Sequence, residues 1–234
     1  MRDDRGVPGQ RVDEFGIRAL VVDWGGVLTG SVDTVWAAWA EQDAVDREHL
    51  RAALRGPAGD HPGPERAGAS LVHALERGEL SGPQFEQLVA QELARRGSPV
   101  QPHGLLERML GGLTPSASML GVVARVKAAG LRTAVLSNSW ANEYPREGWD
   151  ELFDAVVISG EVGMRKPEPR IYQLLLDRLA LPAGACVFVD DLAVNVAAAV
   201  EVGMVGVLHR SVEQTAAELE VLLGLTLRQP GESA

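Results

Sequence analysis

Residues 21–30 read Val-Val-Asp-Trp-Gly-Gly-Val-Leu-Thr-Gly, an apolar run that leads into one aspartate and a glycine-rich turn. The apolar residues before Asp23 predict a buried β-strand, and the glycines predict that the chain turns directly after it. Open α/β sheets keep their chemistry at the carboxyl ends of their strands. We therefore expect Asp23 to stand where such a fold has its functional site.

The chain after residue 115 alternates between strand and helix patterns. Short apolar runs predict the strands, and amphipathic segments opened by proline or closed by glycine predict the helices. Such alternation is typical of a parallel sheet with helices on both faces. We expect a Rossmann-like, doubly wound α/β fold with strands at 20–23, 132–136, 155–158, 186–190 and 205–208, and helices at 116–129, 167–180, 193–202 and 213–223.

Residues 31–114 interrupt this alternation with helical patterns only. Apolar residues recur there at helical spacing, with breaks at the Gly/Pro-rich residues 56–64 and at Ser81-Gly82-Pro83. An insertion at this point must lie above the carboxyl edge of the sheet, where it would work as a cap. We expect the core to comprise residues 17–30 and 115–226, the helical cap residues 31–114, and two flexible tails residues 1–16 and 227–234.

Composition and charge narrow the possible partners. The 234 residues suffice to bury a core, and the formal net charge of −10 argues against a nucleic acid as the main partner. No apolar run is long enough to cross a bilayer, and the N-terminal residues lack the apolar segment of a signal peptide. We expect a cytoplasmic protein with no membrane partner, and the sequence does not indicate its oligomeric state.

Polar residues follow the predicted strands at the points where those strands end. Asp23 ends the first strand, Ser137-Asn138 follows the second, and Asp190-Asp191 follows the strand that begins at Cys186. Because parallel strands end at the same edge of a sheet, these side chains should converge on one crevice. The sequence therefore predicts a pocket with three carboxylates, a hydroxyl and an amide.

One lysine adds a positive charge to this set. Lys166 stands at the start of the predicted helix 167–180, and only it and Lys127 are lysines among the 22 Lys plus Arg residues. Where a plain surface charge suffices this chain uses arginine, so Lys166 indicates a place that needs a compact ammonium group. Carboxylates, a hydroxyl, an amide and a lysine in one pocket suit phosphoryl transfer.

This chemistry assigns a task to each of the converging groups. A carboxylate that attacks phosphorus needs cations, since the two reacting groups are both anionic. Mg²⁺ prefers oxygen ligands, which Asp23, the Gly25 carbonyl and Asp191 can supply. The pair Ser137-Asn138 can hold phosphate oxygens, and Lys166 can neutralise the nucleophile and the transferring group.

Three longer stretches carry a resemblance to a known family. They are Leu136-Ser137-Asn138-Ser139-Trp140, the run Val162–Tyr172 (VGMRKPEPRIY), and Val187–Asp191 (VFVDD) with Asn195. Together with the strand and turn at Asp23, they resemble hydrolases of the haloacid dehalogenase superfamily that have a helical cap after the first motif. Within it, they are most similar to the N-terminal phosphatase domain of soluble epoxide hydrolase and its bacterial relatives. The resemblance covers roughly residues 18–224.

The resemblance implies a Mg²⁺-dependent phosphatase or phosphotransferase that acts on a small phosphorylated metabolite. It implies that Asp23 is the nucleophile and forms an aspartyl phosphate, and that Lys166 is the bridging cation. It also implies that Asp191 is a magnesium ligand with Asp190 beside it, and that Ser137-Asn138 binds phosphate.

Gly25 departs from the pattern of the family's phosphatases. They carry at this position the general acid that protonates the leaving oxygen and then activates water. A glycine can offer its carbonyl to a metal, but it has no proton to give. Since general acid–base catalysis contributes roughly 10²–10⁴-fold, an alkyl phosphate should turn over poorly unless another group substitutes. A cap histidine is one candidate, although nothing in the sequence selects which.

Two tryptophans follow the motifs directly. Trp24 follows the expected nucleophile, and Trp140 follows the expected phosphate-binding pair. If both line the pocket, the substrate has an apolar or ring-shaped part.

Three other functions stay open at this point. A 2-haloacid dehalogenase would need no leaving-group proton, but it also needs no metal, whereas this chain keeps the pair Asp190-Asp191. A phosphonate hydrolase would need a cap lysine, and residues 31–115 contain none. A binding protein that kept the fold and lost turnover is the third alternative.

Overall fold

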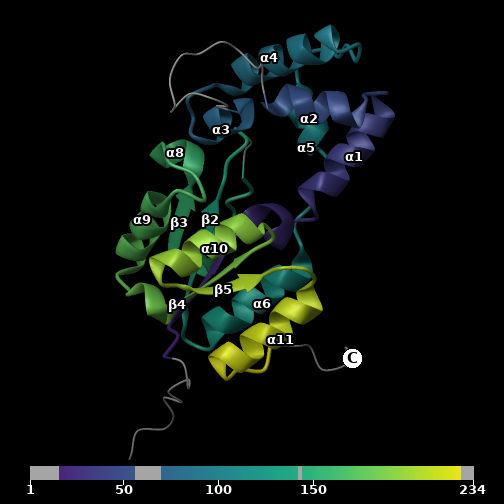
Figure 1. The fold of residues 1–234 in the computed structure, drawn as a ribbon. Coiled ribbons are helices and arrows are strands. Elements are labelled where there is room, and N and C mark those ends of the chain that lie inside the picture. Colours follow the sequence, from purple (N-terminus) through teal and green to yellow (C-terminus); the bar gives the residue numbers. More distant parts are fainter. Residues whose placement is uncertain (1–15, 56–69, 142–143, 228–234) are drawn as a thin grey trace, which may run out of the picture.

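The centre of the molecule is a five-stranded parallel sheet (Figure 1). The computed structural model describes residues 16–55, 70–141 and 144–227. The strands lie in the order β3-β2-β1-β4-β5, with bounds β1 (Ala19–Val22), β2 (Arg132–Ser137), β3 (Ala155–Ile158), β4 (Cys186–Asp190) and β5 (Val205–Leu208). The predicted doubly wound α/β fold is confirmed, and each predicted strand is present.

The central strand β1 is buried along its whole length. It pairs with β2 on one side and β4 on the other, so that Val22 lies opposite Val135 and Val189. Each of its four residues has no exposed surface. A strand covered on both faces has no polar side to present, which explains why it is a continuous apolar run rather than an alternating one.

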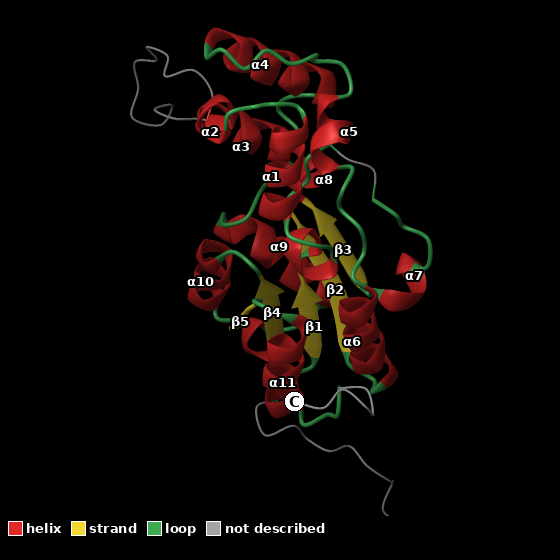
Figure 2. Cartoon of the chain, turned by 90° about the vertical axis from the view of Figure 1, so that its right-hand side faces the viewer, coloured by secondary structure: helices red, strands yellow, loops and turns green. Residues whose placement is uncertain are grey.

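Four long helices cover the two faces of the sheet (Figure 2). Apolar residues of α9 (Pro169–Leu179) and α10 (Ala193–Val202) form one core cluster with the sheet. Those of α6 (Ala117–Ala128) and α11 (Val212–Leu223) form a second cluster on the opposite face. The sequence pattern predicted these four helices, whereas it missed the short elements α7 (Trp149–Leu152), α8 (Ser159–Val162) and the helical turn Ala183–Ala185. Elements of three or four residues are too short to show a hydrophobic period.

Helix α9 begins two residues later than the sequence pattern predicted. The first proline after Lys166 is Pro167, but Pro169 is the residue at the start of the helix, after Glu168. Proline is favoured at the first helical position because its missing N–H would have no partner there. Lys166 therefore lies in the loop before α9, and the loop carries it to the edge of the sheet.

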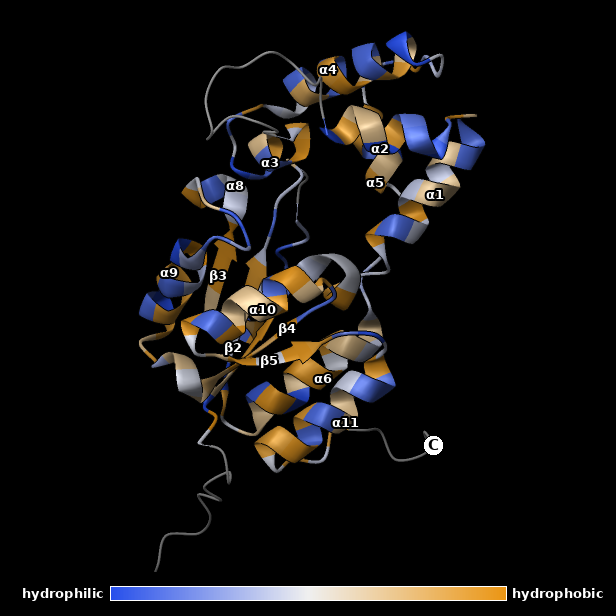
Figure 3. Ribbon diagram, in the orientation of Figure 1, coloured by the Kyte–Doolittle hydropathy of each residue, from blue (hydrophilic) through white to orange (hydrophobic). Residues whose placement is uncertain are grey.

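Five helices lie between β1 and α6 in sequence and beyond the carboxyl ends of the strands in space (Figure 1). We refer to them as the helical insertion. Their bounds are α1 (Val32–Gln42), α2 (Arg47–Arg55), α3 (Leu71–Glu76), α4 (Gly82–Arg95) and α5 (Leu105–Leu110). In Figure 3 these helices carry apolar and polar stripes, and their apolar residues form a core cluster separate from the two clusters at the sheet. Residues 56–64 and both expected tails, apart from Gly16 and Leu227, lie outside the described residues.

The chain enters and leaves the helical insertion through one narrow connection. Thr29 and Pro115 form an antiparallel bridge, and the Ser116 N–H donates to the Leu28 carbonyl at 2.8 Å. The insertion also contacts the core directly after α3, where Arg77 pairs with Glu168 at 3.0 Å. These contacts hold the insertion over the ends of β1 and β2. No helix in the described ranges is long and apolar enough to cross a membrane.

Gly206→Ala should destabilise the fold through steric overpacking. A Cβ atom at this position of β5 would lie 2.6 Å from Val196 Cγ1 and 2.8 Å from Val200 Cγ2, both on α10. We expect the free energy of unfolding to fall by about 1–3 kcal/mol, measured by urea denaturation. Gly184→Ala is the control, since its Cβ would meet only the Gly203 carbonyl at 3.9 Å. Equal denaturation midpoints for the two variants would contradict this packing.

Candidate active site

Asp23 stands at the carboxyl end of β1, where the chain turns sharply. It is buried, and its Oδ1 accepts a hydrogen bond from the Trp24 N–H at 2.7 Å. Gly26 makes the turn possible with a φ of +77°. A Cβ atom on Gly26 would lie 2.2 Å from Asp191 Oδ2, so this position must be glycine for the Asp191 carboxylate to approach the turn.

The Lys166 ammonium group lies between two of the predicted site carboxylates. Its Nζ is 2.8 Å from Asp23 Oδ1 and 2.6 Å from Asp190 Oδ2. The side chain is almost completely buried, and burial opposes its positive charge. The two carboxylates outweigh that effect and raise the pKa of Lys166 above its ordinary value, so the ammonium group stays charged. The structure thus brings the predicted nucleophile and the predicted cation into direct contact.

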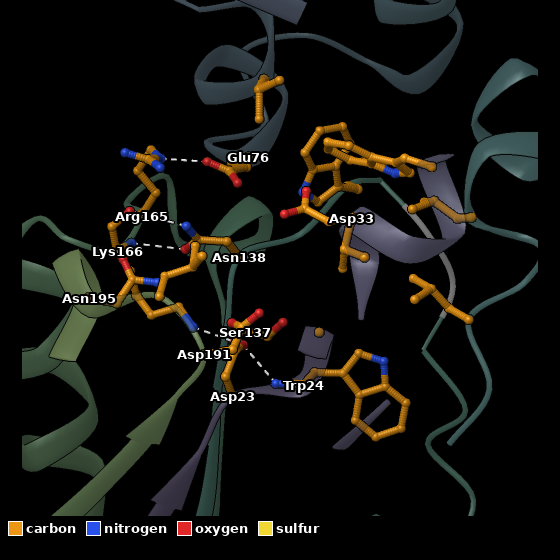
Figure 4. Close-up of a pocket in the computed structure, with 18 of the residues that line it drawn as sticks. Asp23, Trp24, Asp33, Glu76, Ser137, Asn138, Arg165, Lys166, Asp191 and Asn195 are labelled. Carbon is orange, nitrogen blue, oxygen red and sulfur yellow. Dashed lines mark hydrogen bonds and ion pairs between the residues drawn. The ribbon is translucent and has the colours of Figure 1, made fainter. Parts of the chain in front are cut away.

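Two asparagines hold this arrangement in place. The Asn138 amide accepts from the Lys166 backbone N–H at 2.9 Å and donates to the Lys166 carbonyl at 3.1 Å. Asn195 on α10 donates from Nδ2 to both oxygens of Asp190, at 3.0 and 3.1 Å. Asn138, expected to bind phosphate, therefore fixes the backbone of Lys166, as Figure 4 shows. Its contact with phosphate stays a prediction.

Three carboxylates come together beside the turn. Asp23, Asp190 and Asp191 each offer an oxygen, and these oxygens lie within 4.8 Å of one another. Burial raises the pKa of Asp23 to about 8 although Lys166 opposes the rise, and burial together with Asp190 raises the pKa of Asp191 to about 6. A divalent cation would stabilise both ionised carboxylates, so this donor set fits Mg²⁺.

The three carboxylates differ in how free they are to bind a metal. Asp190 Oδ1 already accepts from the Leu192 N–H at 2.8 Å, and its Oδ2 accepts from Lys166. We expect Asp23 and Asp191 to be the direct magnesium ligands, together with the Gly25 carbonyl that the sequence suggests. Asp190 then holds Lys166 in position beside them.

Tyr144 joins the site although the sequence pattern did not indicate it. Its hydroxyl shares a hydrogen bond of 3.0 Å with Ser137 Oγ, at the end of β2. Burial raises the pKa of Tyr144 to about 12, so this phenol stays protonated near neutral pH. Its ring packs edge-on against Trp24, with centroids 5.9 Å apart. The only sequence signal was its rarity, since the chain has two tyrosines.

A cavity of about 310 Å³ opens above these residues, between the sheet and the helical insertion. Its floor includes Asp23, Ser137, Lys166 and Asp191. The insertion, the segment that follows it and the loop after β2 contribute an apolar wall. Most of that wall consists of Val32, Trp36, Val72, Leu110, Leu113 and Trp140. Trp36 and Trp140 pack edge-on with ring centroids 4.6 Å apart.

Both tryptophans singled out from the sequence line this cavity. Trp24 is 6% exposed and also packs against Trp149, with ring centroids 5.0 Å apart. Trp140 packs against Trp36 and Phe85, both in the helical insertion. Contact of either ring with a substrate stays a prediction.

Three charged residues of the cavity wall were not found from the sequence. Glu76 on α3 and Arg165 form a largely buried ion pair of 2.5 Å across the boundary between the insertion and the core. Burial raises the pKa of Glu76, and Arg165 opposes that rise. Asp33 on α1 is the third charged residue. Asp33 and Glu76 belong to no motif, and Arg165 lies in the run Val162–Tyr172 without an expected role. Only the fold brings the insertion over the sheet and these three charges into the cavity wall.

A family model of haloacid dehalogenase-like hydrolases matches residues 17–203. This chain belongs to the haloacid dehalogenase-like hydrolase family. The match includes the strands that carry Asp23, Ser137 and Asp190, and it confirms the resemblance drawn from the motifs. Family membership supports a hydrolase activity.

Curated relatives include proteins that are much longer than this chain. Acyl-CoA dehydrogenase family member 10 of Mus musculus is 34% identical over 221 residues, which cover 90% of this chain and 19% of the relative. Bifunctional epoxide hydrolase 2 of Sus scrofa is 27% identical over 230 residues, covering 91% of this chain and 40% of the relative. This chain thus spans between a fifth and two fifths of the length of these two proteins.

A shorter relative and a solved structure agree with this family. The sesquiterpene phosphatase of Aspergillus oryzae is 31% identical over 155 residues, covering 64% of this chain and 78% of the relative. A HAD family enzyme from Bacteroides thetaiotaomicron, solved with magnesium and inorganic phosphate, superposes with a TM-score of 0.62 at 17% identity. The superposition covers 83% of this chain and 94% of that enzyme, and it shows a shared fold.

The two lysines of the chain allow a matched stability test. Lys166→Met leaves Asp23 and Asp190 buried without their cation, and we expect the free energy of unfolding to fall by about 3–5 kcal/mol without added metal. Lys127 pairs with Asp154 at 2.7 Å, but both side chains are about a third exposed. Lys127→Met should therefore cost about 0–1 kcal/mol. Urea denaturation measures both, and equal losses would contradict the central role of Lys166.

Proposed function

We propose that this protein is a magnesium-dependent phosphatase or phosphotransferase that acts on a small phosphorylated metabolite through an aspartyl phosphate on Asp23. The observation that carries the proposal is the contact of Lys166 Nζ with Asp23 Oδ1, at 2.8 Å, on the floor of a partly closed cavity. A carboxylate attacks a phosphoryl group only when nearby cations offset the repulsion between them. Lys166 supplies one such charge.

The hydrogen bonds of Asp23 leave one oxygen for the reaction. Oδ1 accepts from the Trp24 N–H and from Lys166, whereas no described residue donates to Oδ2. We assign the attack on phosphorus to Oδ2. Mg²⁺ bound by Asp23 and Asp191 would supply further positive charge for the phosphoryl oxygens. Ser137, held by Tyr144, offers its hydroxyl to the same oxygens.

The apolar wall supports a substrate with an apolar or ring-shaped organic part. The Trp36 and Trp140 rings and four aliphatic side chains line the same cavity as the carboxylates. The volume of about 310 Å³ suits a small molecule. The similarity to the sesquiterpene phosphatase of Aspergillus oryzae supports the same class of substrate.

A phosphate-release screen with and without Mg²⁺ tests the reaction. Asp23→Asn should lower the magnesium-dependent rate by at least about 10³-fold, because the nucleophile is lost. Asp150→Asn, an exposed aspartate on α7, is the matched control and should keep the rate. Chelation of Mg²⁺ should abolish activity of the unaltered protein.

Two outcomes of that screen would overturn the proposed function. Phosphate binding without turnover on any substrate would indicate a binding protein. Chloride release from 2-haloacids in the presence of a chelator would indicate a dehalogenase.

Trp36→Ala tests the substrate class. Removing this ring from the cavity wall should cost on the order of 1–2 kcal/mol of apolar contact with the substrate. The KM for cyclohexyl phosphate should then rise about tenfold, while the KM for glycerol phosphate should change little. An equal change for both substrates would argue against recognition of an apolar part.

A further inference from the structure

The turn after β1 does not require a glycine at position 25. The φ and ψ of Gly25 are −68° and 125°, which any residue can adopt. A Cβ atom there would meet only Val32 Cγ2, at an ordinary contact distance of 3.4 Å. Gly26 differs, because its φ is +77° and its missing side chain makes room for Asp191. The turn would therefore accept a side chain at position 25, although it carries none.

The contact between Gly25 and Val32 shows which helix lies beside the turn. Val32 is the first residue of α1, so its approach to Gly25 places the first turn of this helix next to the turn that carries the nucleophile. Asp33 is the next residue. Both residues line the cavity that contains Asp23, Lys166 and Asp191.

The carboxyl group of Asp33 faces the reacting end of this cavity. Figure 4 shows it pointing from α1 into the space above Asp23 and Asp191. Its negative charge is one cause of the raised pKa of Asp191, after burial and Asp190. No residue in the described part of the chain forms a hydrogen bond or ion pair with the Asp33 side chain, so the carboxyl group is free to bond a ligand.

Apart from Asp23, Lys166 and Asp191, described above, the titratable groups of the cavity offer no alternative to Asp33. Glu76 is held by Arg165 at 2.5 Å. The Tyr144 hydroxyl is bonded to Ser137, and its pKa of about 12 prevents it from acting as a base near neutral pH. None of the four described histidines lines the cavity, and His61 lies outside the described residues. The described residues therefore offer no histidine in the cavity wall that could act as the substitute acid suggested from the sequence.

We propose that Asp33 is the general acid and base that replaces the carboxyl group missing at position 25. This inference rests on the proposed phosphatase function. As Asp23 Oδ2 bonds to phosphorus, the bond from phosphorus to the leaving oxygen breaks, and the Asp33 carboxyl proton moves to that oxygen to give the alcohol.

The second half of the reaction returns Asp23 and Asp33 to their starting protonation states. Asp33 takes a proton from a water molecule while the water oxygen bonds to phosphorus. The bond from phosphorus to Asp23 breaks, which releases inorganic phosphate and returns Asp23 to its ionised form. The proton taken from water remains on Asp33 for the next cycle.

A pair of substrates that differ in their leaving group tests this role. Cyclohexyl phosphate and 4-nitrophenyl phosphate have rings of similar size, but only the alkoxide of the first needs a proton to leave. We expect Asp33→Asn to lower kcat/KM for cyclohexyl phosphate about 10²-fold, while kcat/KM for 4-nitrophenyl phosphate changes little. The constant kcat/KM reports the steps up to the first chemical one, so slow hydrolysis of the aspartyl phosphate does not obscure the comparison.

Two further variants and one further measurement complete the experiment. Glu41→Gln, at an exposed position of the same helix, should leave both substrates unaffected. The double variant Gly25→Asp with Asp33→Asn should recover most of the rate on cyclohexyl phosphate, since Gly25 has room for a side chain. Intact-mass analysis during turnover of 4-nitrophenyl phosphate should show more phosphorylated protein for Asp33→Asn than for the unaltered chain, because water is no longer activated.

The outcomes separate this inference from the proposed function. No phosphate release from either substrate by the unaltered protein would count against the phosphatase itself. Activity on 4-nitrophenyl phosphate alone would show that no acid operates at the site, and would overturn the role of Asp33. An equal loss on both substrates for Asp33→Asn would also overturn it, because a binding residue has no preference for the poorer leaving group.

Discussion

The buried ammonium group of Lys166 is the interaction on which the active-site region depends. Asp23 and Asp190 lie at the ends of neighbouring strands, and the pairing of Val22 with Val189 makes them direct neighbours. Two buried carboxylates at this spacing repel each other and lose their hydration. Lys166 contacts both, at 2.8 and 2.6 Å, and offsets that cost. The contact with Asp23 also gives the proposed nucleophile its counter-charge. Both the stability of the site and its proposed chemistry therefore depend on Lys166.

Much of the surrounding structure positions this lysine. Asn138 binds the Lys166 backbone through both of its polar atoms, and Asn195 binds the Asp190 carboxylate. These contacts join β2, the loop before α9, β4 and α10. Asparagine suits this task because its amide both donates and accepts. Asn138, which the sequence suggests as a phosphate ligand, thus has its observed side-chain contacts with the protein backbone.

The helical insertion gives the site its cavity wall and its additional charges. Without it, the carboxyl edge of the sheet would present its carboxylates to water. With it, apolar side chains such as Trp36 and Val72 line the cavity that contains Lys166, and electrostatic interactions there become stronger as water is excluded. Asp33 comes from the first turn of this insertion. A group absent from the turn after β1 can therefore be supplied by the helix that packs against that turn.

The sequence by itself determined the sheet and the positions of the strand-end residues. Apolar runs, and the glycines and prolines that mark their ends, are local signals. They predicted each strand of the core and its four long helices. The motifs at Asp23, Ser137, Lys166 and Asp191 indicated the family because parallel strands end at one edge. Only the tertiary structure decided that Asn138 binds Lys166 and that Tyr144 binds Ser137. It also decided that Asp33 shares the cavity with Asp23. These contacts join segments with no common periodicity, and they depend on how the insertion and loops pack over the sheet, which local patterns do not encode.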